Sequence, residues 1–344
     1  MGSEAPRTLL VLKPSSFGDI IHTLPAVARL KAAWPDCRIS WLVNPEWMPL
    51  LEGNPAVAEI IPFPRGEFRG WGGGLRLARW LRSEIVGRRF DLALDFQGLL
   101  RTAVIGRVSG ARKIVGLSDA REGASWFYHR TVISPRQPVH AAVRYMALAD
   151  AVIDGQEEAL QKGLDIIDGF PLPPGKPVDL PADFRDGFIL IHPFARGTNK
   201  SLSLNEIQDF TRELNSSKII IVGRSESPVD GLERGSLNLL NQTSIAELIW
   251  LIRRAAFVIS VDSGPAHLAA ALKRPMVSIH SWSDPRRVGP CRPDAWVWKN
   301  GRLAQMRDLA VMGQDFFEPR SLYLRAEDVA AIAALAISPS NSCA

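Results

Sequence analysis

Ser260-Val261-Asp262-Ser263-Gly264-Pro265-Ala266-His267 is the stretch that decides the fold. The apolar run Ala255–Ile259 before it predicts a buried parallel strand. The residues after Pro265 predict a helix, whose first turn tolerates proline because its N–H would need no partner. A small-residue turn between a strand and a helix presents backbone N–H groups and the positive end of the helix dipole. The turn therefore predicts a phosphate or diphosphate site, and capping of a core helix by Asp262 and Ser263 is an equally good interpretation.

A second stretch of the same kind lies near the N-terminus. Thr8–Leu12 predicts a strand, and Asp19 opens a predicted helix that runs to Ala33 with apolar side chains at helical spacing. Gly18 is the only glycine of this turn, so neither a dinucleotide fingerprint nor a P-loop is present. A carboxylate at such a turn can take a proton from a hydroxyl group, or it can simply complement the dipole of its helix.

Strands and helices alternate through both halves of the chain, which predicts parallel sheets of the doubly wound α/β class. The 344 residues fit two domains. A segment rich in proline, 171–187, predicts a linker between an N-terminal domain over 1–170 and a C-terminal domain over 188–337. The final predicted helix belongs to the second domain, with packing back on the first as an open alternative. The tail 338–344 is predicted to be disordered. Ligands of such folds bind outside the carboxyl ends of the strands, so we expect a central cleft.

Composition narrows the possible partners. The formal net charge of +5 favours an anionic partner: a phosphorylated substrate, an acidic lipid surface or a nucleic acid. Cys37, Cys291 and Cys343 are scattered, which predicts neither a disulfide framework nor a zinc site. His267 and His280 show no metal-ligand spacing, so no metal is predicted. With no apolar stretch long enough for a bilayer and no secretion signal at the start, we expect a cytoplasmic protein.

Three further segments carry groups suited to anions or nucleotides. The loop His192–Lys200 holds Thr198 and Lys200, which can bind phosphate, and Lys200 is a candidate to neutralise a diphosphate leaving group. Glu226 follows a predicted strand at the place where a ribose would be held. Arg65 and Arg69, in a Gly/Arg/Trp-rich loop, are candidates to contact an acidic acceptor. A solvated basic loop and a surface carboxylate are the plain alternatives.

Three motifs resemble a known family. They are KPSSFGDIIHTLPA (Lys13–Ala26), DFQGLLRT (Asp95–Thr102) and SVDSGPAHLAAAL (Ser260–Leu272), with Ser283-Asp284-Pro285 in support. In this order they resemble the heptosyltransferases, the bacterial family 9 glycosyltransferases, and the resemblance spans nearly the whole chain.

The resemblance implies a GT-B architecture, with an ADP-sugar in the C-terminal domain and an acidic lipopolysaccharide-core or similar glycolipid acceptor in the N-terminal domain. It implies an inverting glycosyltransferase, without metal or cofactor, in which Asp19 is the general base and Lys200 stabilises the diphosphate. Peripheral contact with the inner face of the cytoplasmic membrane and no nucleic-acid partner follow as expectations. The expected donor-binding residues are Thr198, Glu226, Asp262, Ser263, Gly264 and His267. The expected acceptor-binding residues are Ser16, Arg65, Arg69, Gln97 and Arg101.

The sequence also departs from the family pattern. Ser201-Leu202-Ser203 follows Lys200 where Trp-Pro is common, and Gly223-Arg224-Ser225 stands where a glycine-rich turn is expected. Ser281-Trp282 replaces the usual Gly-Pro or Gly-Ala. The sugar and nucleotide therefore stay open, heptose and ADP being the family expectation. Two other classes also stay open. One is a non-transferring enzyme of the same fold, such as a nucleotide-sugar epimerase or hydrolase, and the other is a catalytically silent nucleotide-sugar-binding protein.

Overall fold

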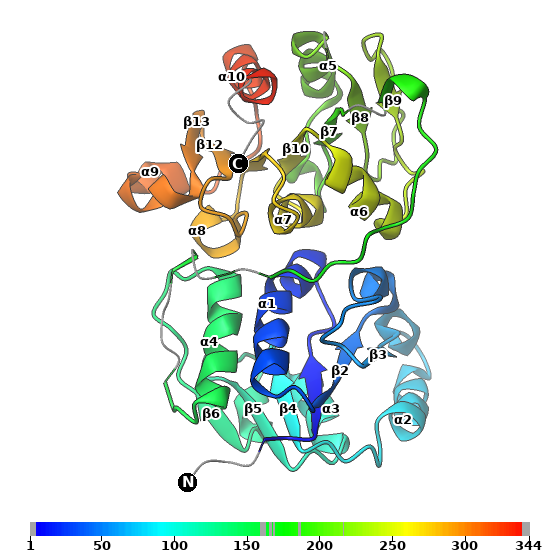
Figure 1. Ribbon diagram of the computed structural model, residues 1–344, viewed down its shortest axis with the longest axis vertical. Coiled ribbons are helices and arrows are strands. Elements are labelled where there is room, and N and C mark those ends of the chain that lie inside the picture. Colours follow the sequence, from blue (N-terminus) through cyan, green and yellow to red (C-terminus); the bar gives the residue numbers. More distant parts are fainter. Residues whose placement is uncertain are drawn as a thin grey trace. The chain divides into compact units, whose positions relative to one another are not determined.

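The computed structural model describes residues 5–158, 163–164, 167, 169–184, 187–215 and 217–338, apart from the side chain of Thr198. The chain divides into two compact units, Met1–Pro173 and Pro174–Ala344. Each unit has one sheet covered by helices (Figure 1). In the described residues, no helix is both long enough and apolar enough to cross a membrane. Beyond residue 338, the predicted disordered tail lies outside the described residues.

Unit 1 is built on a six-stranded parallel sheet in the order β3-β2-β1-β4-β5-β6. This is the strand order of a Rossmann sheet, and the direction of winding reverses between β1 and β4. The strands are β1 (Thr8–Leu12), β2 (Arg38–Val43), β3 (Glu59–Pro62), β4 (Leu92–Asp95), β5 (Lys113–Leu117) and β6 (Arg130–Val132).

The helices of unit 1 follow the predicted alternation. They are α1 (Phe17–Ala33), α2 (Gly73–Glu84), α3 (Leu100–Val108) and α4 (Ala141–Ile153), with 3₁₀ helices η1 (Pro45–Leu50), η2 (Arg65–Phe68) and η3 (Ala124–Phe127). Helix α1 begins two residues earlier than Asp19 and continues through Pro25. Helices α1 and α4 lie side by side (Figure 1), and both are largely buried.

Unit 2 repeats the same winding with one addition. Its seven-stranded sheet has the order β13-β12-β11-β10-β7-β8-β9. The strands are β7 (Ile189–His192), β8 (Ile219–Ile221), β9 (Ser236–Asn238), β10 (Phe257–Val261), β11 (Met276–His280), β12 (Trp296–Lys299) and β13 (Arg302–Gln305). The predicted doubly wound α/β class is confirmed, and the sheet has one antiparallel edge, where β13 pairs with β12. Asn300 and Gly301 make this hairpin possible, because both adopt the positive φ that a two-residue turn requires.

The helices of unit 2 are α5 (Leu204–Glu213), α6 (Ile245–Arg254), α7 (Gly264–Ala271), α8 (Pro285–Val288), α9 (Gln314–Phe317) and α10 (Ala326–Ile337), with η5 (Ala182–Phe184), η6 (Thr198–Lys200) and η7 (Met306–Val311). Ser244 and Glu247 form a capping box at the start of α6. Helix α10 packs against α5, and its Val329 and Ile332 are buried in the core of unit 2.

Candidate active site

A polar cluster of unit 1 gathers where β1 ends and α1 begins. Oδ2 of Asp19 accepts hydrogen bonds from the backbone N–H of Ser16, at 3.1 Å, and from its hydroxyl, at 2.8 Å. Asp19 therefore caps its own helix, as one interpretation of the sequence predicts. Its other oxygen, Oδ1, accepts a hydrogen bond from the hydroxyl of Tyr145 on α4 at 3.0 Å and lies 3.7 Å from Nζ of Lys13. The cap thus leaves Oδ1 for a second role.

Lys13 contacts several residues of this cluster. Its side chain is buried, and Nζ donates to the Tyr145 hydroxyl at 2.8 Å and to the Phe96 carbonyl at 3.2 Å. Burial lowers the pKa of Lys13. Burial opposes ionisation of Asp19, but the charge of Lys13 and the hydrogen bonds from Ser16 and Tyr145 lower the Asp19 pKa overall. The Asp19 side chain stays 35% exposed, so an ionised carboxylate is accessible at this turn.

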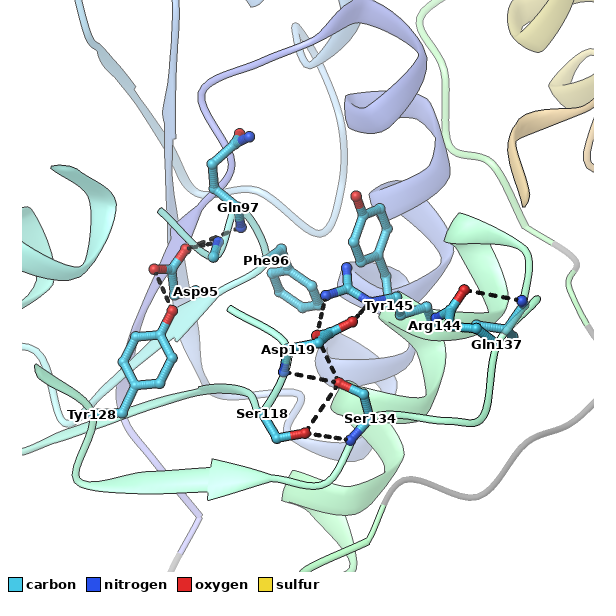
Figure 2. Close-up of polar contacts among 12 residues, drawn as sticks. Asp95, Phe96, Gln97, Ser118, Asp119, Tyr128, Ser134, Gln137, Arg144 and Tyr145 are labelled. Atoms are coloured by element: carbon cyan, nitrogen blue, oxygen red, sulfur yellow. Dashed lines mark hydrogen bonds and ion pairs between the residues drawn. The ribbon is translucent and has the colours of Figure 1, made fainter. Parts of the chain in front are cut away.

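The neighbouring loop after β4 is held by a single buried carboxylate, Asp95. It accepts hydrogen bonds from the backbone N–H groups of Gln97 and Gly98 and from the hydroxyls of Thr102 and Tyr128, all within 3.0 Å. Figure 2 shows the bonds from Tyr128 and from the Gln97 backbone, with the Gln97 side chain directed away from Asp95. Burial raises the pKa of Asp95. This network fixes the loop that offers the Phe96 carbonyl to Lys13.

Two atoms of the same loop region are left for a ligand. Oε1 of Gln97 and Nε of Arg101 are buried, and neither has a hydrogen-bond partner among the described residues. Burial, and then the charge of Arg65, lower the pKa of Arg101, so these two predicted acceptor arginines interact electrostatically. Within the described residues, the side chain of Arg69 makes no hydrogen bond or ion pair.

In unit 2, a chain of hydrogen bonds leads to Asp262 at the end of β10. The Ser278 hydroxyl contacts Nε2 of His280 at 3.0 Å, Nδ1 of His280 contacts the Ser283 hydroxyl at 2.9 Å, and Ser283 donates a short hydrogen bond to Oδ2 of Asp262. This order assigns the ring proton of His280 to Nδ1. Burial lowers the pKa of His280 to about 4, so the ring is neutral at pH 7. This series of hydrogen bonds orients the Asp262 carboxylate through Oδ2.

The other oxygen of Asp262 faces the predicted donor residues. Oδ1 lies 4.0 Å from Nε2 of His267. Burial opposes ionisation of Asp262, but electrostatic interactions with His280, His267 and Lys200 and the hydrogen bond from Ser283 lower its pKa overall. The structure therefore brings Lys200, Asp262 and His267 together as the sequence predicts. His280 and Ser283 join them without having been predicted.

Ser263 begins α7 without capping it through its side chain. Its hydroxyl instead contacts Nδ1 of His192, at the end of β7, at 3.1 Å. Burial lowers the pKa of His192 to about 4. Gly223, at the end of β8, has φ +132°, and a Cβ there would lie 3.2 Å from the His192 ring. The turns after three neighbouring strands therefore interlock around the start of α7, where Gly264 is the first helical residue.

The remaining predicted donor residues are placed differently. Glu226 is exposed, and no hydrogen bond or ion pair joins it to another described residue. Thr198 begins η6, and its side chain lies outside the described residues. Lys299, which the sequence did not suggest, is fully buried at the end of β12 and donates a short hydrogen bond to the Ser281 carbonyl. It thereby anchors the loop that carries Ser283. Burial lowers the pKa of Lys299 to about 8.

Sequence reasoning missed five side chains that complete the two clusters: Lys13, Tyr145, His192, His280 and Ser283. Lys13 and Ser283 lie within the quoted motifs, so the motifs themselves pointed to them. Tyr145 had no signal, because it lies on a helix 126 residues from Asp19. In the described part of the chain, no three His, Cys, Asp or Glu side chains are grouped so that they could hold a metal ion.

Residues 76–311 match the model of "Glycosyltransferase family 9 (heptosyltransferase)". The chain belongs to this family. The match covers more than half of the chain and includes Asp95, Lys200 and Asp262. The resemblance seen in the motifs is thereby confirmed, and with it the identification of the protein as a glycosyltransferase.

Individual relatives agree with the family. The chain is 25% identical over 300 residues to the lipopolysaccharide core heptosyltransferase OpsX of Haemophilus influenzae, covering 84% of this chain and 83% of OpsX. It is 27% identical over 294 residues to lipopolysaccharide heptosyltransferase 1 of Escherichia coli K12, covering 82% and 90%. The solved structure of E. coli heptosyltransferase WaaC with ADP-2-deoxy-2-fluoro heptose has a TM-score of 0.67 and 23% identity, covering 85% of this chain and 93% of that one. This structural likeness shows the shared two-domain Rossmann-like fold.

Proposed function

We propose that this glycosyltransferase moves a heptose from ADP-heptose to an acidic lipopolysaccharide-core acceptor, with inversion and without a metal ion. OpsX and the E. coli enzyme are named as lipopolysaccharide heptosyltransferases, which supports the sugar and the acceptor class. The ADP-heptose analogue bound by the structural neighbour supports the donor. The observation that carries the mechanism is the carboxylate of Asp19, which is accessible, kept ionised and held on both sides by its neighbours.

Asp19 acts in this proposal as the general base. The acceptor hydroxyl oxygen attacks the anomeric carbon of the donor while the bond from that carbon to the diphosphate oxygen breaks. The hydroxyl proton passes to Asp19 as the new bond forms and the hydroxyl becomes acidic. Attack from the side opposite the leaving group inverts the anomeric centre. Lys13 and Tyr145 hold Oδ1 in place, so little reorganisation accompanies the proton transfer.

Different residues of the donor cluster suit the diphosphate and the sugar of an ADP-sugar. Lys200 and the backbone N–H groups at the start of α7 suit the diphosphate, whose negative charge grows as it leaves. Asp262 is a carboxylate and would repel phosphate, so we assign it to hydroxyl groups of the sugar. We propose that His267 contacts the diphosphate or the sugar. Glu226 and Thr198 are candidates to contact the nucleotide.

The acceptor cluster suits a carboxylated or phosphorylated sugar. Arg65 and Arg101 interact electrostatically, and Nε of Arg101 lacks a partner among the described residues, which is the situation that a bound anion would relieve. Oε1 of Gln97 would accept a hydrogen bond from an acceptor hydroxyl. We propose that Ser16 and Arg69 contribute at the edge of this cluster. Because the proposed acceptor is a glycolipid, we also propose a cytoplasmic enzyme in peripheral contact with the membrane.

Substitution of Asp19 by Asn tests the proposal. The variant keeps the shape of the cap but cannot take the proton, so transfer should fall about 10²–10⁴-fold while ADP still raises the melting temperature. Asp36→Asn, which removes an exposed aspartate of the same unit, is the matched control and should transfer normally. Substantial transfer by the Asp19 variant would refute the base assignment. Consumption of ADP-heptose by the wild-type protein at equal rates with and without acceptor would favour a hydrolase or epimerase.

A further inference from the structure

The segment 64–89 carries the excess charge of the whole protein. It contains seven arginines and two glutamates, so its formal net charge is +5. The whole chain has 41 basic and 36 acidic residues, which also gives +5, and the remainder is therefore balanced. Such a concentration on one helix and its flanking loops marks a surface for an anionic partner.

Helix α2 within this segment has two apolar sides. Leu77, Trp80 and Leu81 face inward, and the Trp80 ring packs on Phe63 and Phe68 with ring centroids 5.2 and 5.8 Å apart. At 100° per residue, the helical positions opposite this face are Leu75, Arg79 and Arg82. Leu75 is 67% exposed, and Val86, two residues past the end of the helix, is 52% exposed. Together with Trp71, which lies just before the helix, these residues form what we call the α2 outer face.

Trp71 lies in a loop whose backbone is hydrogen-bonded to α2, and its side chain points into solvent. The Trp71 side chain is fully exposed. The loop that carries it is bound to α2 through the guanidinium of Arg76. Arg76 donates to the carbonyls of Glu67, Arg69 and Trp71 at 2.5, 2.7 and 3.4 Å. Gly73 is also required, because a Cβ there would lie 2.1 Å from the Phe68 carbonyl oxygen. The loop therefore has a defined shape that displays an indole without burying it.

The arginines of this face are not engaged elsewhere. Arg79 and Arg82 make no ion pair with any residue that the structure describes. They lie on the same side of α2 as Leu75, and Val86 follows just past the end of the helix, so apolar side chains and guanidinium groups are neighbours on this exposed surface. Arginine can bury its stem beside apolar groups while its head reaches phosphates, and tryptophan favours the boundary between hydrocarbon and headgroups. Figure 1 shows α2 at the margin of unit 1, near β3, and the side chains of Arg79 and Arg82 are exposed.

We infer that the α2 outer face docks on an anionic lipid surface, with Trp71, Leu75 and Val86 at the headgroup boundary and Arg79 and Arg82 on lipid phosphates. The inference rests in part on the proposed function, because a glycolipid acceptor gives the enzyme a reason to lie on a membrane. An acidic protein would match the charge, but three exposed apolar side chains beside two arginines, on α2 and the residues that flank it, fit a bilayer boundary better.

Vesicle sedimentation of the full-length protein tests the inference. The wild-type protein should bind vesicles that contain phosphatidylglycerol, bind phosphatidylcholine vesicles much more weakly, and be partly released by salt. The double variant R79Q/R82Q should bind phosphatidylglycerol vesicles roughly tenfold or more weakly. The double variant W71S/L75S should lose the binding that survives high salt. No binding of the wild type to phosphatidylglycerol vesicles would overturn the inference and leave an acidic protein as the occupant.

Matched controls come from the same unit. Arg112→Gln removes an arginine whose side chain is 81% exposed, and Trp126→Ser removes a tryptophan that is 88% exposed. Both should bind vesicles like the wild type, and equal losses in these controls would also overturn the inference. ADP binding and transfer to a lipid-free core oligosaccharide should be unchanged in all four variants. If the wild type fails both of those assays yet binds vesicles, the proposed function fails and the membrane surface stands.

Discussion

The hydroxyl of Tyr145 on α4 donates a hydrogen bond to Oδ1 of Asp19 on α1 at 3.0 Å. Burial and the charge of Asp19 raise the pKa of Tyr145 well above its usual value, so the phenol remains a donor at any working pH. The same hydroxyl accepts from Nζ of Lys13 at 2.8 Å. Tyr145 is therefore a positioning residue that links a buried cation to the carboxylate we assign as the base.

Tyr145→Phe should alter the pH dependence of transfer. Activity requires ionised Asp19, so it falls as pH drops through the pKa of Asp19. Loss of the hydrogen bond weakens the ionised form, so the acidic limb of kcat/KM should move to higher pH by about one unit. At neutral pH kcat should fall by roughly tenfold with little change in KM. Tyr323→Phe, at an exposed tyrosine, is the control. An unmoved acidic limb in the Tyr145 variant would show that the phenol is only structural.

Ser283→Ala should weaken binding of the donor sugar. The variant breaks the link between Asp262 and His280, so the carboxylate loses both an orienting donor and part of the support for its charge. The affinity for ADP-heptose should fall by about tenfold, while the affinity for ADP changes less, because we assign Asp262 to the sugar. Isothermal titration with both ligands measures this difference. Ser227→Ala, at an exposed serine of unit 2, is the control. Equal losses for ADP and ADP-heptose would contradict the assignment.

Acid should destabilise unit 2 at pH values well above those at which ordinary carboxyl groups become protonated. His192 and His280 have pKa values of about 4 in the folded protein, against 6.5 for the unperturbed side chain. Their stabilising effect is complete above pH 6.5 and is lost as pH falls toward 4, because the unfolded chain then binds protons that the folded one does not. Each of these two histidines should lower the free energy of unfolding by about 3 kcal/mol as the pH falls from 6.5 to about 4.

Urea unfolding between pH 7 and 4 measures this loss. The slope of the free energy of unfolding against pH should correspond to about two protons near pH 5. His192→Asn removes one titrating ring, so it should reduce that slope by about one proton even if it lowers stability at pH 7. A slope that the substitution leaves unchanged would show that His192 titrates normally in the folded protein.

Gly223→Ala should disturb the donor cluster through His192. At φ +132° the added Cβ is strained and would lie 3.2 Å from Cδ2 and Nε2 of the imidazole ring, so the ring must shift and its contact with Ser263 is disturbed. The variant should unfold at lower temperature, with a loss of about 1–3 kcal/mol, and should bind ADP more weakly. Gly235→Ala separates the causes, because Gly235 also has positive φ while its nearest atom would be 4.0 Å away. Equal effects at both sites would mean that backbone strain alone matters.

Much of the core of the fold could be predicted from local patterns. The strands β1, β7 and β10 are short apolar runs followed by polar turns, and Ser244 with Glu247 has the residue spacing typical of a helix start, where α6 begins. The edge strands β6 and β9 were missed because each has only three residues, and β9 is half-buried throughout. The hairpin between β12 and β13 was also missed, although the pair Asn300-Gly301 is a recognised signal for a two-residue turn.

The amino-acid sequence by itself determined which side chains stand at the tips of the strand-turn-helix units, because those turns are encoded by neighbouring residues. Asp19 and Asp262 follow from this local code. Only the tertiary structure decided their partners. Tyr145 reaches Asp19 because α4 packs beside α1, and His280 reaches Asp262 because β11 pairs with β10. Those contacts depend on the order of strands and helices in each unit, which arises from burial of apolar surface over the whole chain, so no local pattern reports it.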